Sequence, residues 1–167
     1  MDSRGFFARA WCRDEFLRAG IDINIAQVNV SYNKLAGTLR GMHYASPPSP
    51  EGKIVRCERG RVFDVILDLR SESATYLQHY CLHLVSDQFN AIFIPPGVAH
   101  GFQTLVDNCV MHYMMTAAYD PMQANGVRFD DPVFNIRWPQ IVSQIHDRDR
   151  SFPDFVPSID GSGCRGR

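Results

Sequence analysis

Hydrophobic and polar positions alternate in short segments along most of this chain. From residue 21 onward, stretches rich in β-branched and aromatic residues are separated about every ten residues by turn signals such as Arg59-Gly60 and Pro95-Pro96-Gly97. The pattern predicts strands over residues 21–30, 53–57, 61–69, 76–85, 91–94, 101–106 and 109–116. This spacing is typical of an antiparallel sandwich, a jelly roll or a small barrel, so the predicted fold class is all-β with a few short helices.

Three segments depart from this alternation. Residues 11–19 carry apolar side chains at helical spacing and end before Gly20, which predicts a short helix. Residues 141–145 fit either a final helix or an extended arm. The tail from about residue 156 is expected to be extended or frayed. The length favours one domain over residues 1–167.

The segment 62–68 has apolar residues on both sides of the predicted strand, so we expect it to be covered on both faces. Asp64 and Asp68 lie on this strand. A buried aspartate costs on the order of several kcal/mol unless it has a partner. Asp64 therefore caps buried backbone, pairs with an arginine, or orients a histidine of a functional site.

Composition narrows the class of protein. A hydrophobic fraction of 45% and a charged fraction of 21% are those of a globular protein. The formal net charge of −1 provides no overall attraction for nucleic acid or for an anionic membrane surface. The five cysteines form no C-x-x-C pair, which favours reduced thiols over a disulfide framework. With no apolar leader or membrane-length window, the expected location is the cytoplasm.

Two histidines are candidates for proton chemistry. His43 and His100 each lie beside glycine in an apolar strand context. Imidazole titrates near neutral pH, so it suits removal of a proton from a carbon beside a carbonyl group. Such a base works best when a carboxylate holds its second nitrogen, and the sequence Asp147-Arg148-Asp149 is one candidate source. Packing as ordinary core histidines is the alternative.

A metal site is the weaker interpretation of these histidines. Metal sites in small β-barrels typically need His-x-His with a carboxylate and a further histidine. Neither His43 nor His100 has a histidine two positions away. His79 and His83 share a strand face, but no nearby carboxylate joins them. No metal ligand is predicted.

Arg40, Lys53 and Tyr113 complete the candidate chemistry. Arg40 and Lys53 lie in apolar strand contexts, where each could bind phosphate or stabilise an oxyanion, although most isolated cations are surface charges. Tyr113 lies in the apolar segment Met-His-Tyr-Met-Met. It is either a core tyrosine with a satisfied hydroxyl or a general acid that delivers a proton to the face opposite the base.

These residues lie in blocks that match a known family. The chain resembles the dTDP-4-dehydrorhamnose 3,5-epimerases, nucleotide-sugar epimerases with a metal-free cupin-type jelly-roll fold, from residue 2 to about residue 153. The matching blocks are DSRGFF at 2–7, QVNVS at 27–31, GTLRGMHY at 37–44, KIVRC at 53–57, GRVFDV at 60–65, DLR at 68–70, IPPGVAHGF at 94–102, YDP at 119–121, DDP at 130–132, IRWP at 136–139 and DRD at 147–149.

The resemblance implies a role for each matching residue. His43 is the base that removes the proton beside the C4 ketone, and Asp149 is its carboxylate partner. Lys53 stabilises the enolate oxygen, and Tyr113 protonates the opposite face. The residues implied to bind the substrate or line its pocket are Arg4, Phe7, Gln27, Asn29, Arg40, Asp64, His100, Tyr119 and Trp138.

The resemblance also implies partners. Arg4 and Phe7 match positions that reach across a dimer interface in the family, so a homodimer acting on a nucleotide sugar is expected. No cofactor, metal, nucleic acid or membrane partner is implied.

The chain departs from the family pattern at several positions. Arg9 replaces an acid, Met114 replaces a lysine, Ala45 replaces a glutamine, and the leading strand of most members is not present before the first block. The sequence therefore admits epimerisation at C3, at C5 or at both, on a dTDP-linked or another NDP-linked sugar. A 3,4-ketoisomerase and a non-enzymatic sugar-nucleotide-binding cupin are the alternatives, and a metal-dependent oxygenase is the weakest.

Overall fold

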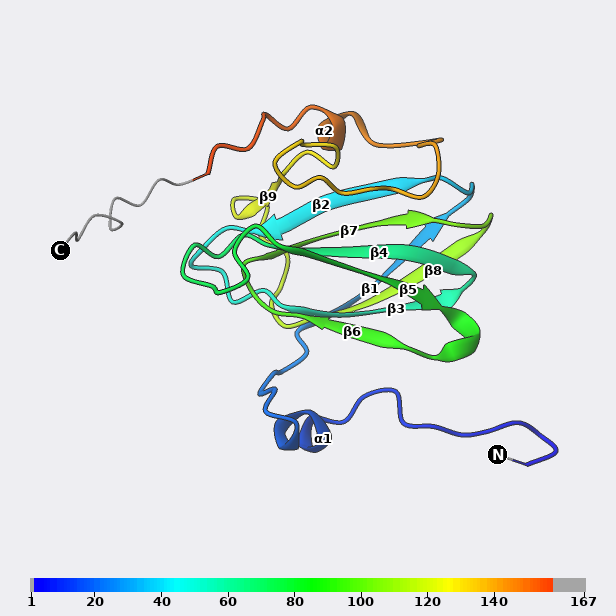
Figure 1. The fold of residues 1–167 in the computed structure, drawn as a ribbon. Coiled ribbons are helices and arrows are strands. Elements are labelled where there is room, and N and C mark those ends of the chain that lie inside the picture. Colours follow the sequence, from blue (N-terminus) through cyan, green and yellow to red (C-terminus); the bar gives the residue numbers. More distant parts are fainter. Residues whose placement is uncertain (1, 158–167) are drawn as a thin grey trace.

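The computed structural model describes residues 2–157, within which two antiparallel β-sheets pack face to face (Figure 1). Their strand orders are β1-β8-β3-β6 and β5-β4-β7-β2-β9. Strands distant in sequence are neighbours, as in a jelly roll, which confirms the predicted fold class. The elements are α1 (Arg13–Arg18), β1 (Gln27–Asn33), β2 (Leu39–Ala45), β3 (Lys53–Arg59), β4 (Arg61–Asp68), β5 (His79–Val85), the 3-10 helix η1 (Ser86–Gln88), β6 (Ala91–Ile94), β7 (Val98–Thr104), β8 (Cys109–Met115), β9 (Ala124–Gly126) and α2 (Asp147–Arg150).

A first hydrophobic core fills the space between the two sheets. Val55 and Met111 from the four-stranded sheet meet Val62, Leu84 and Phe102 from the five-stranded sheet. All five side chains are almost completely buried. Burying a side chain of this size contributes roughly 1.5–3 kcal/mol, so this layer is the main force that holds the sheets together.

A second core covers the outer face of the five-stranded sheet. Val65 and Leu67, on the opposite side of β4, pack with Val127, Phe134 and Trp138. Figure 1 shows the chain after β9 passing along this side of the sheet. The strand over 62–68 is therefore covered on both faces, as its sequence pattern predicted, and β7 is buried along its whole length.

An irregularity in β2 directs two polar side chains toward one cavity. The pairing of β2 with β7 changes register between Arg40 and His43. Residues three apart face opposite sides of a regular strand, but a bulge allows both side chains to face the space between the sheets. Gly41 is required here, because its φ is +126° and a Cβ atom would lie 2.5 Å from Cα of Gly101.

Several strand boundaries differ from the prediction. Residues 21–26 are irregular, because β8 ends at Met115, opposite Gln27, and offers no further partner. Residues 76–78 belong to a turn in which the Leu77 N–H donates to Asp68 O at 2.8 Å, so β5 begins later than predicted. β7 begins at Val98, earlier than predicted, because the Pro95-Pro96-Gly97 turn ends there.

The helical predictions have mixed outcomes. The helix over 11–19 is present in shortened form as α1. Residues 141–145 form an extended arm, in which Gln144 makes a parallel bridge with Thr38. The short helix α2 follows this arm and was not predicted. The part of the predicted frayed tail from residue 158 onward lies outside the described residues. Within the described part, the helices are too short and too polar to cross a membrane.

Candidate active site

The predicted residues of β1, β2, β3, β7 and β8 come together at a cavity of about 290 Å³ between the sheets. Strand register explains this convergence. His43 of β2 pairs with His100 of β7, while Tyr113 of β8 lies opposite Asn29 on one side and Val55 on the other. The candidate residues that line the cavity are Asn29, Arg40, His43, Lys53, His100 and Tyr113.

His43 is held by the carboxylate of Asp149. Nε2 of His43 lies 2.7 Å from Oδ1 of Asp149, and Oδ2 accepts a hydrogen bond from the Gly41 N–H at 3.2 Å. Burial opposes the charged form of Asp149, but the hydrogen bond from His43 and the other contacts together hold its pKa below the usual value. A carboxylate accepts, so Nε2 carries the hydrogen and the lone pair of the neutral ring is on Nδ1.

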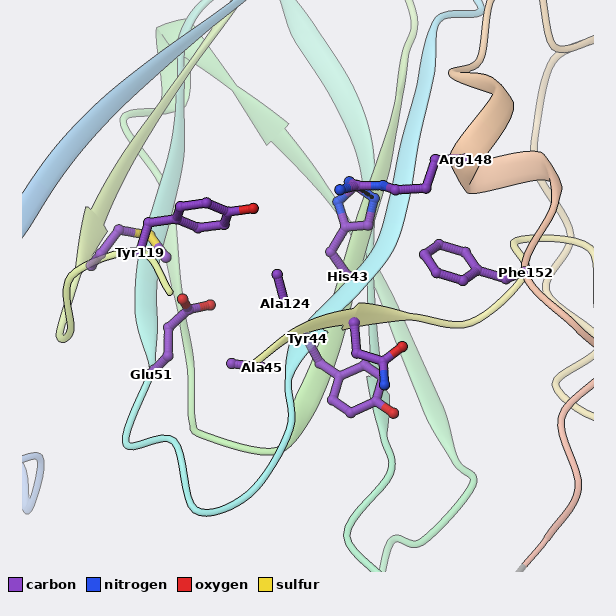
Figure 2. A pocket seen from close by; sticks show the side chains of 10 residues that line it. His43, Tyr44, Ala45, Glu51, Tyr119, Ala124, Arg148 and Phe152 are labelled. Atoms are coloured by element: carbon purple, nitrogen blue, oxygen red, sulfur yellow. Dashed lines mark hydrogen bonds between the residues drawn. The ribbon is translucent and has the colours of Figure 1, made fainter. Parts of the chain in front are cut away.

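Arg148 adds a positive charge beside this pair. Its Nη2 lies 3.3 Å from Nε2 of His43, and its Nε lies 3.4 Å from Oδ1 of Asp149. Figure 2 shows the guanidinium group against the His43 ring. Because Nε2 already donates to Asp149, Arg148 acts on the ring as a neighbouring cation and not as its hydrogen-bond donor.

His100 has a partner of its own, Asp64. Nε2 of His100 lies 2.8 Å from Oδ2 of Asp64, and both side chains are buried. Of the possibilities that the sequence left open for Asp64, the structure shows the orientation of a histidine. The His100 ring lies edge-on to Tyr113, with ring centroids 6.2 Å apart.

Tyr113 and Lys53 are buried titratable groups, and burial favours the uncharged form of each. Burial, helped by the charge of Asp64, raises the pKa of Tyr113 far above its ordinary value, so the phenol keeps its proton. Burial lowers the pKa of Lys53, and the nearby Glu51 partly opposes that change. The cavity thus contains a protonated phenol and an amine whose charge depends on its neighbours.

A second cavity, of about 180 Å³, adjoins the first and shares His43 and Met115 with it. Figure 2 shows Tyr119, Glu51, Arg148 and Phe152 around this space. Tyr119 is 61% exposed, and its backbone N–H donates to Oε1 of Gln27 at 3.1 Å. Gln27 in turn donates to Asn29 at 2.9 Å, so Gln27 connects Tyr119 to the first cavity.

Three predicted residues neither line a cavity nor form a hydrogen bond with a residue that does. Arg4 and Phe7 lie on the N-terminal arm, where Arg4 pairs with Asp2 and Phe7 is fully exposed. Trp138 packs in the second core against Phe63, and its indole N–H donates to the Phe129 carbonyl at 2.9 Å. These three side chains are therefore not brought to the site within one copy of the chain.

The positions that depart from the family pattern fall in two places. Ala45 lines the second cavity, beside Glu51. Arg9 and Met114 line a separate groove of about 420 Å³ between the N-terminal arm and the four-stranded sheet, together with Phe6. Of these departures, only Ala45 contacts the candidate site directly.

Sequence reasoning overlooked Glu51 and gave Arg148 no role of its own. Glu51 lies two positions before Lys53, and in an extended chain this spacing places two side chains on the same side. That spacing was a usable signal for a charge pair. Arg148 is adjacent to Asp149, but nothing in a single sequence shows which way its side chain points. Within residues 2–157, no group of three or more His, Cys, Asp or Glu side chains could hold a metal ion.

Comparison with known proteins gives one consistent result. The family model described as dTDP-4-dehydrorhamnose 3,5-epimerase matches residues 1–156. The dTDP-4-dehydrorhamnose 3,5-epimerase of Sinorhizobium fredii is 35% identical over 155 residues, which are 92% of this chain and 80% of the relative.

Two solved structures extend the comparison. The dTDP-4-dehydrorhamnose 3,5-epimerase of Bacillus anthracis, with TDP and PPi bound, is similar with a TM-score of 0.89 and 35% identity, over 93% of this chain and 89% of the other. A 3'-monoepimerase from Streptomyces bikiniensis in complex with dTDP-quinovose has a TM-score of 0.85 and 31% identity, over 92% and 78%. Both similarities extend over nearly the whole chain.

Proposed function

The chain belongs to the dTDP-4-dehydrorhamnose 3,5-epimerase family, and from this membership we propose that it is an isomerase that inverts C3, C5 or both in a dTDP-linked 4-keto-6-deoxyhexose. One observation carries the proposal. His43, with its carboxylate partner, and the buried phenol of Tyr113 line the same cavity, so a base and an acid both reach one bound sugar ring.

The reaction requires removal of a proton from carbon beside the C4 ketone. In the proposed mechanism Nδ1 of His43 takes this proton, and Asp149 stabilises the imidazolium ion that forms. The electron pair moves onto the ketone oxygen, and Lys53 stabilises the resulting enolate with its positive charge. Tyr113 then donates its proton to the other face of the same carbon, which inverts the configuration.

The remaining site residues are proposed to bind the substrate. Arg40 is suited to a diphosphate oxygen, because its guanidinium group is a permanent cation at the edge of the cavity. Its Nε is held by Asn33 at 2.7 Å. Tyr119 offers an exposed aromatic face for the nucleotide base. His100, held by Asp64, contacts the sugar.

Hydrogen exchange during turnover tests this function. Incubation with dTDP-4-keto-6-deoxyglucose in heavy water is expected to incorporate deuterium at carbons beside the ketone, and His43→Ala is expected to abolish the incorporation. His79→Ala, which changes an exposed histidine on β5, is the matched control.

Product analysis separates the alternatives. Exchange and inversion at two positions of the product indicate a 3,5-epimerase, and at one position a single-carbon epimerase. Migration of the ketone seen by NMR would indicate a 3,4-ketoisomerase. Tight binding with no exchange would contradict the proposal and favour a sugar-nucleotide-binding protein.

We also propose that the enzyme is a single-domain protein that acts as a homodimer in the cytoplasm. Exposed Phe7 and the apolar outer surface of the edge strand β1 support the dimer, since monomers rarely leave such groups uncovered. The thiols of Cys12, Cys57, Cys81 and Cys109 are free, and this supports a reducing compartment.

A further inference from the structure

Lys53 and Glu51 form a buried ion pair at the wall of the active-site cavity. Nζ of Lys53 lies 3.6 Å from Oε1 of Glu51, and the two side chains are 10% and 13% exposed. We propose that Glu51 is a positioning residue that keeps Lys53 in its charged ammonium form, ready to stabilise the enolate. This inference rests on the proposed function, in which Lys53 faces the developing charge.

The loop that carries Glu51 is fixed in place. The Gly52 N–H donates to Oγ1 of Thr116 at 2.6 Å, and the Thr116 N–H donates back to the Gly52 carbonyl at 3.0 Å. On the other side of Glu51, the Pro50 carbonyl accepts a hydrogen bond from Oγ1 of Thr116 at 2.9 Å. The backbone on both sides of Glu51 is therefore anchored, and this holds the Glu51 carboxylate beside Lys53.

Glu51 also lies between the two cavities. Its side chain lines the second cavity, while Lys53 lines the first. Among the described residues, Lys53 is the only ion-pair partner of Glu51 within 4 Å. The carboxylate therefore has no other cation that competes for it, and its charge acts on the lysine.

The other groups around Lys53 cannot replace this charge. The titratable and charged groups that face it are Glu51 from the preceding loop, Asp64 from β4, Arg40 and His43 from β2, His100 from β7 and Tyr113 from β8. Asp64 is the other carboxylate of the set, and it is bonded to His100. Arg40 is a cation and disfavours a second positive charge nearby. Burial lowers the pKa of Lys53, and Glu51 is the strongest influence in the opposite direction.

Removing the charge of Glu51 is expected to lower the pKa of Lys53. Without the Glu51 charge, the pKa of Lys53 falls further, so the amine becomes neutral at a lower pH. A neutral amine donates a hydrogen bond but carries no charge to balance an enolate. The loss of activity at alkaline pH should therefore begin at a lower pH, with a change in kcat larger than any change in KM.

The sequence allows a direct measurement, because Lys34 and Lys53 are the only lysines in the chain. With ¹³C-labelled lysine, the Lys34→Arg protein shows a single lysine side-chain signal, whose NMR shift follows the titration of Lys53. In that background, Glu51→Gln is expected to move the titration midpoint to lower pH. Glu58→Gln is the matched control, because Glu58 is an exposed carboxylate on β3, the strand that carries Lys53. This variant should leave the midpoint in place.

The outcomes separate this inference from the proposed function. A midpoint that stays in place or rises in Glu51→Gln would overturn the role of Glu51, even if the wild-type enzyme is active. A midpoint that falls supports it, even if no keto sugar is turned over, in which case only the proposed function fails. If Glu51→Gln does not fold, Glu51→Ala provides the same comparison, and Glu51→Asp should restore a midpoint close to that of the wild type.

Discussion

His43 and Asp149 are 106 positions apart in the sequence, yet Nε2 of the imidazole lies 2.7 Å from Oδ1 of the carboxylate. The arm after residue 140 makes this contact possible, because its bridge to Thr38 brings α2 alongside β2. The pair fixes the tautomer of His43 and leaves the lone pair of the neutral ring on Nδ1, the atom proposed to act as the base. In the proposed mechanism, Asp149 therefore controls the reaction through His43.

Replacing the carboxylate tests that control. In Asp149→Asn, the amide N–H₂ can donate to Nε2, which favours the tautomer with hydrogen on Nδ1 and blocks the base. We expect kcat to fall by roughly 10²–10⁴-fold, the range for loss of a general base. Steady-state kinetics with the keto sugar measure the change. Asp147→Asn, which alters an exposed carboxylate on the same helix, should leave kcat close to the wild-type value.

Tyr113→Phe should separate proton removal from proton delivery. The variant keeps His43 and the shape of the cavity but lacks the phenolic proton. We expect inverted product to form roughly 10²–10⁴-fold more slowly, while deuterium exchange on the His43 face continues. NMR of the sugar during incubation in heavy water follows both processes. Tyr80→Phe, at an exposed position on β5, is the control, and equal loss of exchange and inversion would contradict the assignment.

The strands were predictable where alternation and turn residues agreed. β6 and the start of β8 lie where the pattern placed them, and β4 is covered on both faces as its apolar residues indicated. The pattern failed where pairing ends for tertiary reasons. Residues 21–26 have strand-like composition, but no partner strand extends beside them. Local sequence does not contain that information.

The residues of the candidate site were easier to predict from the sequence than the contacts that they make. His43, Lys53, His100 and Tyr113 meet because strand register aligns them, and a list of polar residues on predicted strands could suggest such a cluster. The position of Trp138 could not be read in this way. Its indole packs in the second core, and Trp138 itself lies in a segment without regular secondary structure, so periodicity gave no guide to its environment.

Gly41 should be among the positions least tolerant of substitution. In Gly41→Ala, the positive φ costs roughly 1–3 kcal/mol, and the contact with Gly101 forces β2 and β7 apart. Gly20→Ala is a matched control, because Gly20 also has a positive φ, of +81°, but has no atom within 4 Å of the added Cβ. Urea unfolding should show a larger loss of stability for Gly41→Ala. Equal losses would mean that the contact has no consequence.

Asp68 should contribute to resistance against acid. Arg70 is the main cause that holds the pKa of Asp68 far below its usual value, and Ser73 and Thr75 also donate to the carboxylate. Because the folded-state pKa is lowered, the stabilisation is complete above the unfolded pKa of about 3.9 and is lost as the pH falls toward the folded-state value.

Asp68→Asn tests this expectation. At pH 7 we expect the free energy of unfolding to fall by roughly 1.5–3 kcal/mol, the range for hydrogen bonds to a charged group. Below about pH 4 the difference from wild type should shrink, because Asp68 of the unfolded wild-type chain then becomes protonated and this favours unfolding. Urea unfolding of both proteins at several pH values measures this difference in the free energy of unfolding. Asp87→Asn, at an exposed position of η1, should show neither effect.

The outer surface of β1 should be buried in the proposed dimer. Val28, Val30 and Tyr32 are 55%, 67% and 52% exposed, and β1 is the edge strand of its sheet. An aspartate at position 30 would place an unpaired charge in an apolar interface, which costs on the order of several kcal/mol. Val30→Asp should therefore weaken self-association by more than about tenfold, since each 1.4 kcal/mol is a factor of ten. Light scattering over a dilution series measures this. Val133→Asp, on the C-terminal segment, should dissociate like the wild type, and a Val30→Asp protein that remains dimeric would place the interface elsewhere.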